Sequence, residues 1–314
     1  MKNASPIQVI KHPLFSYHNI DVFIKRDDLI HPIISGNKWR KLKYNLAQAT
    51  QGSYQGILSF GGCFSNHIHA LAFACQQQNI KSVGIIRGEQ NYANNFTLSW
   101  ARHWGMTLDF VDRKTYRLRN QAEYLAELQR QYPQHFIVPE GGSNTFALPG
   151  VAEVITELND QCDFDSLLTP VGSGGTLAGL IAGDKNQHQL LGIAVLKQSD
   201  YLQAEVKQLL SIEAKQYSNW QILSEFHLGG YAKFSQVDCQ RIIEFSQITG
   251  IDFEPVYSGK MLLALLDLVD NGFFAAKKRI VILHTGGLQG LGGLAQRKII
   301  CPSQWHVPPS PPAQ

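Results

Sequence analysis

From residue 56 to residue 285, short apolar runs alternate with longer amphipathic segments. The apolar runs, each of the length of a strand, lie at 56–60, 81–87, 107–111, 135–139, 166–171, 189–196, 220–226 and 279–285. The segments that place apolar residues at helical spacing include 66–78, 120–132, 201–211, 237–249 and 259–271. Continuous apolar strands separated by helices are typical of parallel sheets that are covered on both faces. We therefore predict an α/β chain with mostly parallel sheets flanked by helices.

The chain of 314 residues is long for one hydrophobic core. Gly, Pro and Ser cluster in "PEGGSNTFALPG" at 139–150, which indicates a boundary. We expect a small domain of residues 45–150 inserted in a larger domain formed by residues 1–44 and 151–314.

Composition and charge exclude several classes of protein. The content of 44% hydrophobic and 17% charged residues is that of a folded globular protein, and a net charge of +3 is too small for a typical nucleic-acid binder. No apolar run reaches the roughly 18 residues that a membrane-spanning helix needs. The N-terminus does not resemble a signal peptide, and the five cysteines are scattered without a C-x-x-C pair. We expect a cytoplasmic protein with no membrane or nucleic-acid partner and no structural metal.

A glycine-rich loop follows the apolar run at 166–171. In "LLTPVGSGGTLAGL" (167–180) the run leads through this loop into a helix of small residues. The loop residues are Gly172, Ser173, Gly174, Gly175 and Thr176. Backbone N–H groups, two hydroxyls and a helix N-terminus form a site suited to phosphate. The loop lacks the Gly-Lys-Ser/Thr of a P-loop, and Leu177 stands where a dinucleotide-binding loop has its third glycine, which disfavours a nicotinamide dehydrogenase.

Two further apolar runs end in glycine pairs, within "SFGGCFSNHIHALA" (59–72) and "RIVILHTGGLQGLGG" (279–293). Since ligands of open α/β sheets bind outside the carboxyl ends of the strands, we expect these loops and the one at 172–176 to converge. Ser65 is also a good helix N-cap. A metal site at His67 and His69 is disfavoured, because residues two apart do not share a helix face.

A lysine stands at a predicted helix start in "ISGNKWRKLKYNLAQ" (34–48). Lys38 follows a Gly-Asn pair, where the positive end of the helix dipole disfavours a cation. Partial burial at such a position lowers the pKa of a lysine and makes its amine a better nucleophile.

An ordered set of motifs resembles one family of enzymes. The motifs are "IKRDDLIHPIISGNKWRKLKY", "SFGGCFSNHIHALA", "VPEGGSNTFALPGVAE", "TPVGSGGTLAGL", "HLGGYAK", "EPVYSGK" and "ILHTGG". They resemble the pyridoxal-phosphate enzymes of fold type II, the tryptophan synthase β-like group, and within it the 1-aminocyclopropane-1-carboxylate deaminase and D-cysteine desulfhydrase family. The resemblance spans nearly the whole chain. It implies two open twisted sheets, pyridoxal 5'-phosphate as cofactor, a small amino acid as substrate and a homodimer.

The first two motifs carry residues of the family's site. By the resemblance, Lys38 forms the Schiff base with the cofactor and Lys41 helps to hold its phosphate. Ser65 faces the substrate and Asn66 contacts the cofactor ring. His67 completes this element on the substrate side, where the deaminase itself has glutamine.

The later motifs carry the remaining residues. The resemblance assigns the phosphate to Gly172–Thr176 and places Tyr231 and Tyr257 at the substrate. It places a hydroxyl, from Thr285 or Ser258, beside the pyridine nitrogen. The deaminase has glutamate where this chain has Ser258 and leucine where it has Thr285. Together with His67 in place of glutamine, these three differences favour desulfhydrase-type elimination.

These residues are compatible with four functions. The preferred hypothesis is a lyase that converts a small amino acid, such as D-cysteine, into a 2-oxo acid, ammonia and sulfide. The alternatives are the cyclopropane deaminase, a cofactor-binding protein with little catalysis and, least favoured, the dehydrogenase. The segment "CFSNHIHA" departs from the family's usual "IQSNHxRQ", and we expect its altered residues to reshape the approach to the substrate. We interpret Cys63 as a packing residue and not as a nucleophile.

Overall fold

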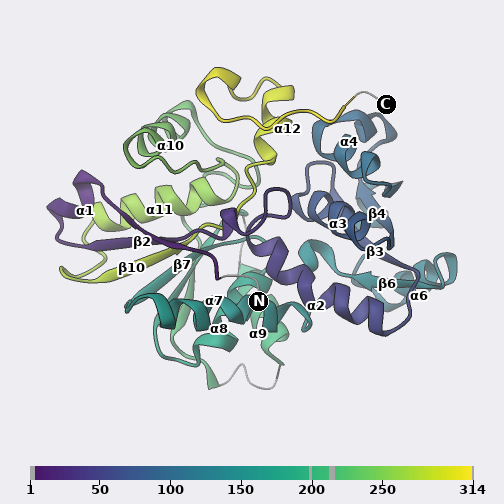
Figure 1. Ribbon diagram of the computed structural model, residues 1–314, viewed down its shortest axis with the longest axis horizontal. Coiled ribbons are helices and arrows are strands. Elements are labelled where there is room, and N and C mark those ends of the chain that lie inside the picture. Colours follow the sequence, from purple (N-terminus) through teal and green to yellow (C-terminus); the bar gives the residue numbers. More distant parts are fainter. Residues whose placement is uncertain (1–3, 198–199, 212–215, 313–314) are drawn as a thin grey trace. The chain divides into compact units, whose positions relative to one another are not determined.

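The computed structural model describes residues 4–197, 200–211 and 216–312, and the chain forms two compact units (Figure 1). Unit 1 comprises Met1–Asn37 and Leu148–Leu288, and unit 2 comprises Lys38–Ala147 and Gln289–Gln314. The domains expected from the sequence differ from these units chiefly at 38–44 and 289–314, which both belong to unit 2. Because compactness does not by itself show independent folding, the predicted domain boundaries stay a prediction.

Unit 1 is built on a six-stranded sheet with the strand order β1-β2-β10-β7-β8-β9. The strands are β1 (Ile7–Ile10), β2 (Asp21–Lys25), β7 (Ser166–Val171), β8 (Gln189–Ala194), β9 (Trp220–Leu223) and β10 (Arg279–Leu283). Strand β1 runs antiparallel to β2, and all other neighbours are parallel. Strands β7, β8 and β10, which are neighbours inside the sheet, are apolar and buried along nearly their whole length, as expected of a sheet covered on both faces.

Helices cover both faces of this sheet (Figure 1). One face carries α1 (Pro13–Tyr17), α10 (Gln236–Thr249) and α11 (Ser258–Asp270), and the other carries α7 (Ala147–Gln161), α8 (Gly175–Asp184) and α9 (Asp200–Leu210). On the second face, Val151 of α7, Leu177 of α8 and Val206 of α9 join a core that includes Leu190 and Val281 of the strands. A short 3-10 helix, η1 (Asp27–Leu29), follows β2.

Unit 2 is built on a four-stranded parallel sheet with the order β5-β4-β3-β6. Its strands are β3 (Gly56–Gly62), β4 (Lys81–Arg87), β5 (Thr107–Val111) and β6 (His135–Val138). Its helices are α2 (Asn37–Gln51), α3 (Asn66–Gln77), α4 (Phe96–His103), α5 (Arg113–Tyr116), α6 (Ala122–Gln131) and α12 (Gly290–Gln296), with the 3-10 helices η2 (Gln90–Asn94), η3 (Glu140–Gly142) and η5 (Pro302–Gln304). Alternate residues of β3 face different neighbours: Leu58 and Phe60 pack with Tyr116 and Leu128, whereas Ser59 bonds to α3.

The predicted α/β class with two mostly parallel sheets is confirmed, and every predicted strand run contains a strand. The pattern did not predict β1 and β2. These strands are four and five residues long, and β2 ends in a lysine, so neither is a continuous apolar run. The buried Lys25 is accommodated because its Nζ lies 2.6 Å from a carboxylate oxygen of Glu157.

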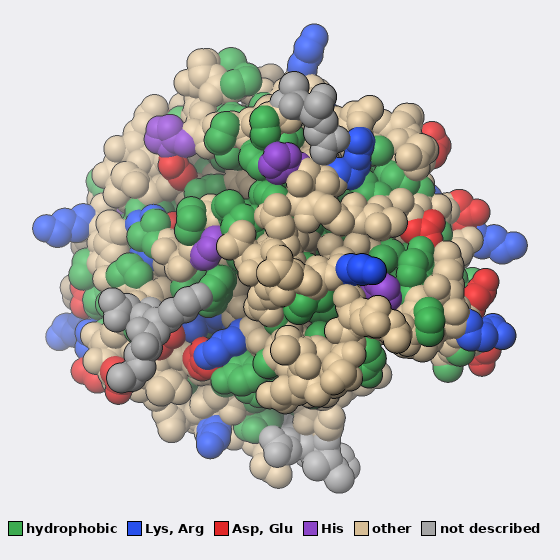
Figure 2. Space-filling view, turned by 45° about the vertical axis from the view of Figure 1, so that its right-hand side comes forward, with side chains coloured by type: hydrophobic (Ala, Val, Ile, Leu, Met, Phe, Trp, Pro, Cys, Tyr) green, Lys and Arg blue, Asp and Glu red, His purple; other side chains and the backbone are tan. Residues whose placement is uncertain are grey.

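The surface agrees with the modest net charge. On the face shown in Figure 2, lysine and arginine side chains stand singly or beside acidic ones, and the described residues form no continuous basic patch there. Among the helices that the structure describes, none combines the length and the apolar character needed to cross a membrane.

Candidate active site

Lys38 and Lys41 lie near the start of α2 in unit 2. Burial lowers the pKa of Lys38 to about 8. Burial, together with the positive charge of Lys38, lowers the pKa of Lys41 well below the ordinary value. Lys41 Nζ donates a 2.6 Å hydrogen bond to Ser143 Oγ. The lowered pKa expected for Lys38 is confirmed, with burial as its cause, and an anion beside these two amines would offset their repulsion.

His67 has a tautomer that can be assigned from its hydrogen bonds. Ser59 Oγ lies 2.7 Å from both His67 Nε2 and Val138 O. A hydroxyl has one hydrogen and a carbonyl can only accept, so Ser59 donates to Val138 and accepts from His67 Nε2–H. Nδ1 is then a bare acceptor, buried and without a hydrogen-bond partner among the described residues. Burial and the charges of Lys38 and Lys41 hold the pKa of His67 well below its ordinary value, so the ring is neutral.

The N-terminus of α3 holds Ser65 and Asn66. Ser65 Oγ accepts a 3.3 Å hydrogen bond from the N–H of Ile68, which confirms the predicted N-cap. Asn66 Oδ1 accepts a hydrogen bond from Gln289 Nε2, within the same unit. These contacts fix both residues at the helix start. Their roles toward substrate and cofactor stay predictions.

Residues Gly172–Thr176 lead from β7 into the first turn of α8 in unit 1, as predicted. Gly174 is the N-cap of α8, with a φ of 75° and no side-chain hydrogen bond to the helix start. Because the first N–H groups of a helix have no acceptor within it, this start is suited to an anion. A Cβ at Gly172 would lie 3.1 Å from Tyr257 Cε1, and one at Gly174 would lie 3.1 Å from Val206 Cγ2. Glycine therefore allows the loop to approach its neighbours closely.

Asn37 connects two of the predicted loops within unit 1. Its side-chain Nδ2 donates a 2.8 Å hydrogen bond to Thr176 Oγ1, and its backbone N–H donates a 3.3 Å bond to Thr285 O. Gly36 has a φ of 65°, and a Cβ there would lie 1.8 Å from Thr285 O. The Gly-Asn pair before Lys38 is thus fixed on the loops that follow β7 and β10. Sequence reasoning singled out Lys38 and missed Asn37, although the pair itself was the available signal.

Tyr231 and Tyr257 lie together in unit 1. Their ring centroids are 6.0 Å apart, with an angle of 67° between the planes. Tyr231 is 42% exposed. Since Gly172 also packs on Tyr257, unit 1 brings both predicted tyrosines and the start of the glycine loop together.

The predicted residues therefore form two sets. Unit 1 contains the glycine loop, both tyrosines, Ser258 and Thr285, and unit 2 contains Lys38, Lys41 and the segment 65–67. Convergence of the loop after β3 with those after β7 and β10 stays a prediction.

Comparison with known proteins identifies the family. A family model described as "Pyridoxal-phosphate dependent enzyme" matches residues 3–286. This chain belongs to the pyridoxal-phosphate-dependent enzymes. A protein of Thermotoga maritima, provisionally named a 1-aminocyclopropane-1-carboxylate deaminase, is 30% identical over 311 residues, which cover 94% of this chain and 97% of that protein. A D-cysteine desulfhydrase of Klebsiella pneumoniae is 27% identical and covers 86% of this chain and 88% of its own length.

Solved structures show the same fold. The crystal structure of an "ACC deaminase homologue" is 28% identical, with a TM-score of 0.81 over 94% of this chain and 93% of that one. Serine racemase of Dictyostelium discoideum, 17% identical with a TM-score of 0.65, covers 91% of this chain and 92% of its own and shares the fold alone. The pyridoxal-phosphate-dependent enzyme described here has fold type II, and its cofactor is pyridoxal 5'-phosphate. The family, fold and cofactor predicted from the sequence are confirmed.

The residues present fit this cofactor. In unit 1, α8 begins without a side-chain cap, which leaves its N–H groups suited to a phosphate. In unit 2, the half-buried Lys38 and the buried Lys41 lack a carboxylate partner among the described residues, and the buried Nδ1 of His67 is an acceptor without a donor there. Phosphate oxygens can accept hydrogen bonds from the N–H groups of α8, and an aldehyde can react with a lysine amine. A ring hydroxyl or an ammonium group can donate a hydrogen bond to His67 Nδ1.

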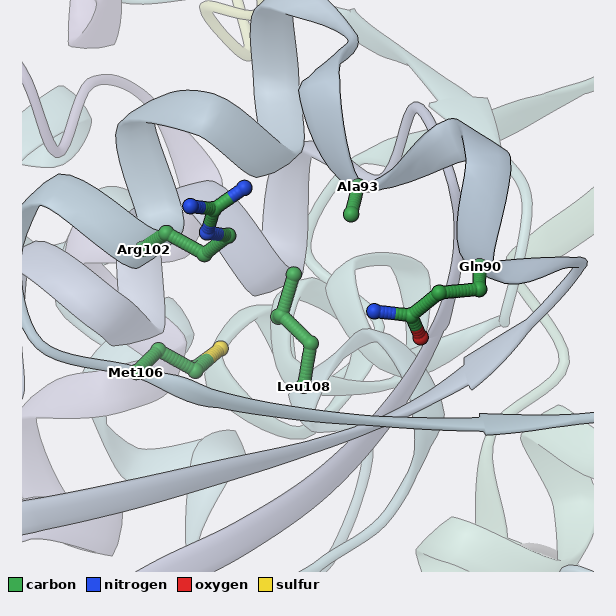
Figure 3. A pocket seen from close by; sticks show the side chains of 5 residues that line it. All are labelled: Gln90, Ala93, Arg102, Met106 and Leu108. Carbon is green, nitrogen blue, oxygen red and sulfur yellow. The ribbon is translucent and has the colours of Figure 1, made fainter. Parts of the chain in front are cut away.

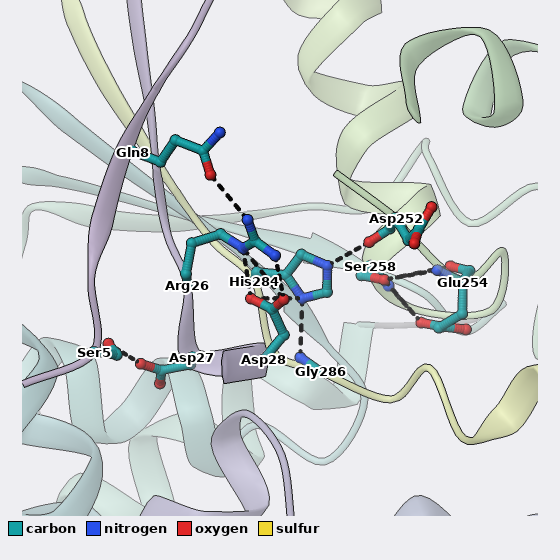
Figure 4. Close-up of polar contacts among 10 residues, drawn as sticks. All are labelled: Ser5, Gln8, Arg26, Asp27, Asp28, Asp252, Glu254, Ser258, His284 and Gly286. Carbon is teal, nitrogen blue, oxygen red and sulfur yellow. Dashed lines mark hydrogen bonds and ion pairs between the residues drawn. The ribbon is translucent and has the colours of Figure 1, made fainter. Parts of the chain in front are cut away.

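Glu254, which sequence reasoning missed, organises the start of α11 in unit 1 (Figure 4). Its Oε1 accepts hydrogen bonds of 2.8 and 2.7 Å from the N–H groups of Tyr257 and Ser258, and its Oε2 accepts one of 2.7 Å from Val256. Burial raises the pKa of Glu254 to about 7. Ser258 Oγ, fully buried, lies 3.2 Å from Glu254 Oε1 and donates to it. Glu254 therefore holds the Ser258 hydroxyl, and Thr285 is the better candidate beside the pyridine nitrogen.

His284 fixes the loop that carries Thr285 (Figure 4). Its Nε2 donates a 2.7 Å hydrogen bond to Asp252 O, so Nδ1 is the acceptor for the N–H of Gly286 at 3.2 Å. Burial lowers the pKa of His284, which keeps this neutral tautomer. Sequence reasoning assigned a role to Thr285 but none to the histidine before it.

Three residues that depart from the family's usual pattern pack inside unit 2. Ile68 and Ala70 are buried on α3, and the ring of His69 meets that of Trp104 edge-on at 4.7 Å. His69 thereby packs against the C-terminal end of α4, whose C-cap is Trp104. The expectation that these three residues reshape the approach to the substrate stays a prediction.

The two departures before Ser65 are also held within unit 2. The Arg297 guanidinium stacks 4.0 Å above the centroid of the Phe64 ring. The thiol of Cys63 donates a 3.3 Å hydrogen bond to Arg87 O, and burial raises its pKa. Cys63 is a packing residue, as predicted, because a thiol with a raised pKa is a poor nucleophile.

A separate pocket in unit 2 contains none of the predicted site residues (Figure 3). It is lined by Gln90, Ala93, Arg102, Met106 and Leu108, from η2, α4 and the region of β5. Arg102 Nη1 donates a 2.8 Å hydrogen bond to Asn94 Oδ1.

Proposed function

We propose that this enzyme is a lyase of the D-cysteine desulfhydrase type. With water, it would convert a small amino acid such as D-cysteine into a 2-oxo acid, ammonia and sulfide. The observation that carries the proposal is Lys38, a lysine with a pKa of about 8 directly after a Gly-Asn pair fixed on Thr176 and Thr285. When bound, the cofactor withdraws electrons from the α-carbon of the substrate.

The residues of unit 2 supply the amine and part of the recognition. Lys38 Nζ would hold the cofactor through its aldehyde and would serve as the base that takes the proton from the substrate α-carbon. A pKa near the working pH suits both steps. Lys41 neutralises phosphate charge, and Ser65 and Asn66 contact substrate and ring. His67, through its bare Nδ1, accepts a hydrogen bond from an O–H or N–H of the ligand.

The residues of unit 1 supply the phosphate site and the tyrosines. The N–H groups of Gly172–Thr176 bind phosphate oxygens at the start of α8. Tyr231 and Tyr257 face the reacting amino acid. Thr285 would offer its hydroxyl to the ring nitrogen of the cofactor, and a hydroxyl in place of a carboxylate would favour an uncharged ring. A weaker electron sink is sufficient when a good leaving group, such as sulfide, accepts the charge.

The environment of Ser258 favours the desulfhydrase over the cyclopropane deaminase. By resemblance, the deaminase has glutamate at this position. Here Ser258 is fully buried against Glu254, so a carboxylate at this position would face the first one away from bulk solvent. Like charges at such short range disfavour each other strongly. The deaminase remains the second candidate because a relative of 30% identity bears that name.

Reduction with borohydride tests the cofactor's attachment. We expect the purified protein to be yellow and to yield, after reduction and proteolysis, a pyridoxyl adduct on Lys38. The variant Lys38→Ala should lack the adduct and should release no 2-oxo acid from D-cysteine. Lys43→Ala, an exposed lysine on the same helix, is the matched control and should keep both. An adduct on another lysine, or a protein that takes up no cofactor, would refute the proposed site.

The homodimer and the cytoplasmic location expected from the sequence belong to this proposal. All five cysteines are free, which suits a reducing compartment. Light scattering on the purified protein tests the dimer, and fractionation of the source cells tests the location.

A further inference from the structure

The loop that carries Tyr231 has a strained backbone. In residues 227–232, the φ angles of Leu228, Gly229, Gly230 and Ala232 are 53°, 91°, 118° and 52°. Left-handed backbone is unfavourable for Leu and Ala, because their Cβ atoms approach the following carbonyl oxygen. Such strain persists only where surrounding structure holds it, and it concentrates at functional sites.

One buried ammonium group holds this loop. Lys260, on the first turn of α11, is fully buried. Its Nζ donates hydrogen bonds to three carbonyl oxygens, at 2.5 Å to Gly230, at 2.7 Å to His227 and at 3.2 Å to Val195. An ammonium has three hydrogens, so each has an acceptor. Val195 follows β8, and the lysine therefore ties the loop to the carboxyl end of the sheet.

The segment just before α11 fixes the second tyrosine. Glu254 accepts from the N–H of Tyr257, and its charge favours the protonated form of Lys260. Burial opposes that charge and lowers the pKa of Lys260 to about 8. Tyr257 and Tyr231 meet with ring centroids 6.0 Å apart. A buried carboxylate and a buried ammonium thus hold one tyrosine each.

We propose that Lys260 is a positioning residue, whose ammonium group holds residues 227–232 so that Tyr231 faces Tyr257 and the amino-acid substrate. The inference rests on the proposed function for its catalytic consequence. Its structural part, the clamp on the loop, concerns unit 1 alone. Lys260 does not react with the substrate, and it acts through Tyr231.

The first experiment removes the ammonium group with Lys260→Met, a side chain of similar length without charge. Hydrogen–deuterium exchange should become faster in the loop, while the cofactor content and the visible spectrum stay those of the wild type. The kcat/KM for D-cysteine should fall by about 100-fold, the effect of misplacing a group by about 1 Å. Lys260→Arg should restore part of the loop protection, because it keeps the charge. Lys233→Met, an exposed lysine two residues after Tyr231, is the matched control and should change neither measurement.

A double-mutant cycle tests whether Lys260 acts through Tyr231. If it does, Lys260→Met should cost little further kcat/KM once Tyr231→Phe is present, whereas independent effects would multiply. Multiplied losses, or unchanged exchange and kcat/KM in Lys260→Met, would overturn the proposal.

A second variant keeps the test open if Lys260→Met does not fold. Gly230→Ala leaves the ammonium in place but disfavours the φ of 118°. This variant should show faster hydrogen–deuterium exchange in the loop and a lower kcat/KM. Faster exchange in the variant together with an unchanged kcat/KM would count against the proposal. If the wild type turns over no amino acid, the proposed function fails. Hydrogen–deuterium exchange of residues 227–232 in Lys260→Met then still decides whether Lys260 holds the loop.

Discussion

The reactivity of Lys38 can be predicted quantitatively as the pH is changed. An ordinary lysine has a pKa of 10.5, and burial lowers that of Lys38 to about 8. The direction follows because burial disfavours the charged form of an amine. At pH 7 the difference multiplies the neutral, nucleophilic fraction of Lys38 by about 300. Below pH 8 that fraction should rise about tenfold for each pH unit, and it should level off above pH 8.

Competitive acetylation measures this fraction directly. The protein stripped of cofactor is labelled with a trace of acetic anhydride across a pH series, and each lysine is quantified by mass spectrometry. Lys43, exposed on the same helix, serves as the internal reference for the reagent. We expect the labelling of Lys38, corrected for accessibility, to reach half its maximum near pH 8.

One result would refute the reasoning. If labelling of Lys38 still rises tenfold per pH unit between pH 8 and pH 10, its amine is an ordinary lysine. Burial at the start of α2 would then not prepare the residue for the cofactor. A flat profile from pH 6 upward would refute the stated magnitude in the opposite direction.

Three further predictions follow from single contacts. Gly174→Ala should lower the free energy of unfolding by about 1–2 kcal/mol, because its φ is 75°, and should weaken cofactor binding. Gly250→Ala is the control, because Gly250 has a φ of 70° and open space around it; this variant should lose similar stability and keep the cofactor affinity. Ser258→Glu should destabilise by about 3–5 kcal/mol in denaturant unfolding, because it buries an unpaired carboxylate beside Glu254. His67 should be neutral with Nε2 protonated at pH 6, as read by nitrogen NMR shifts, since burial and nearby lysines lower its pKa.

Each prediction has an outcome that contradicts it. Equal loss of cofactor affinity in the Gly174 and Gly250 variants would show a global effect instead of a phosphate site. A stable Ser258→Glu protein would remove the electrostatic argument against the deaminase. A doubly protonated His67 ring at pH 6 would exclude Nδ1 as the acceptor for a ligand.

The sequence predicted the sheets because their central strands are uniformly apolar. It also located the glycine loop, since a strand followed by Gly172–Thr176 and a helix of small residues has a strong local pattern. Strands β1 and β2 escaped because an edge strand and a strand ending in Lys25 lack that pattern. The partner of Lys25, Glu157, is more than 130 residues away in the chain and could not be read from local spacing.

Some site residues could likewise be recognised from local sequence, whereas others depend on residues distant in the chain. Lys38 was recognisable from its misplaced charge and from the resemblance. Glu254 and Lys260 lie inside a quoted motif, "EPVYSGK", but their importance depends on burial and on carbonyls distant in the chain. The tautomer of His67 likewise depends on Ser59 and Val138, which only the fold brings to it.

The choice of substrate tests the central claim most directly. The holoenzyme is given D-cysteine, L-cysteine, D-serine, β-chloroalanine and 1-aminocyclopropane-1-carboxylate in turn, and formation of 2-oxo acid and ammonia is measured for each. We predict the highest kcat/KM for D-cysteine, with sulfide released in equal amount to the 2-oxo acid. A higher kcat/KM for the cyclopropane amino acid would contradict the proposed elimination, and turnover of none of the five by a protein that holds its cofactor on Lys38 would contradict catalysis itself.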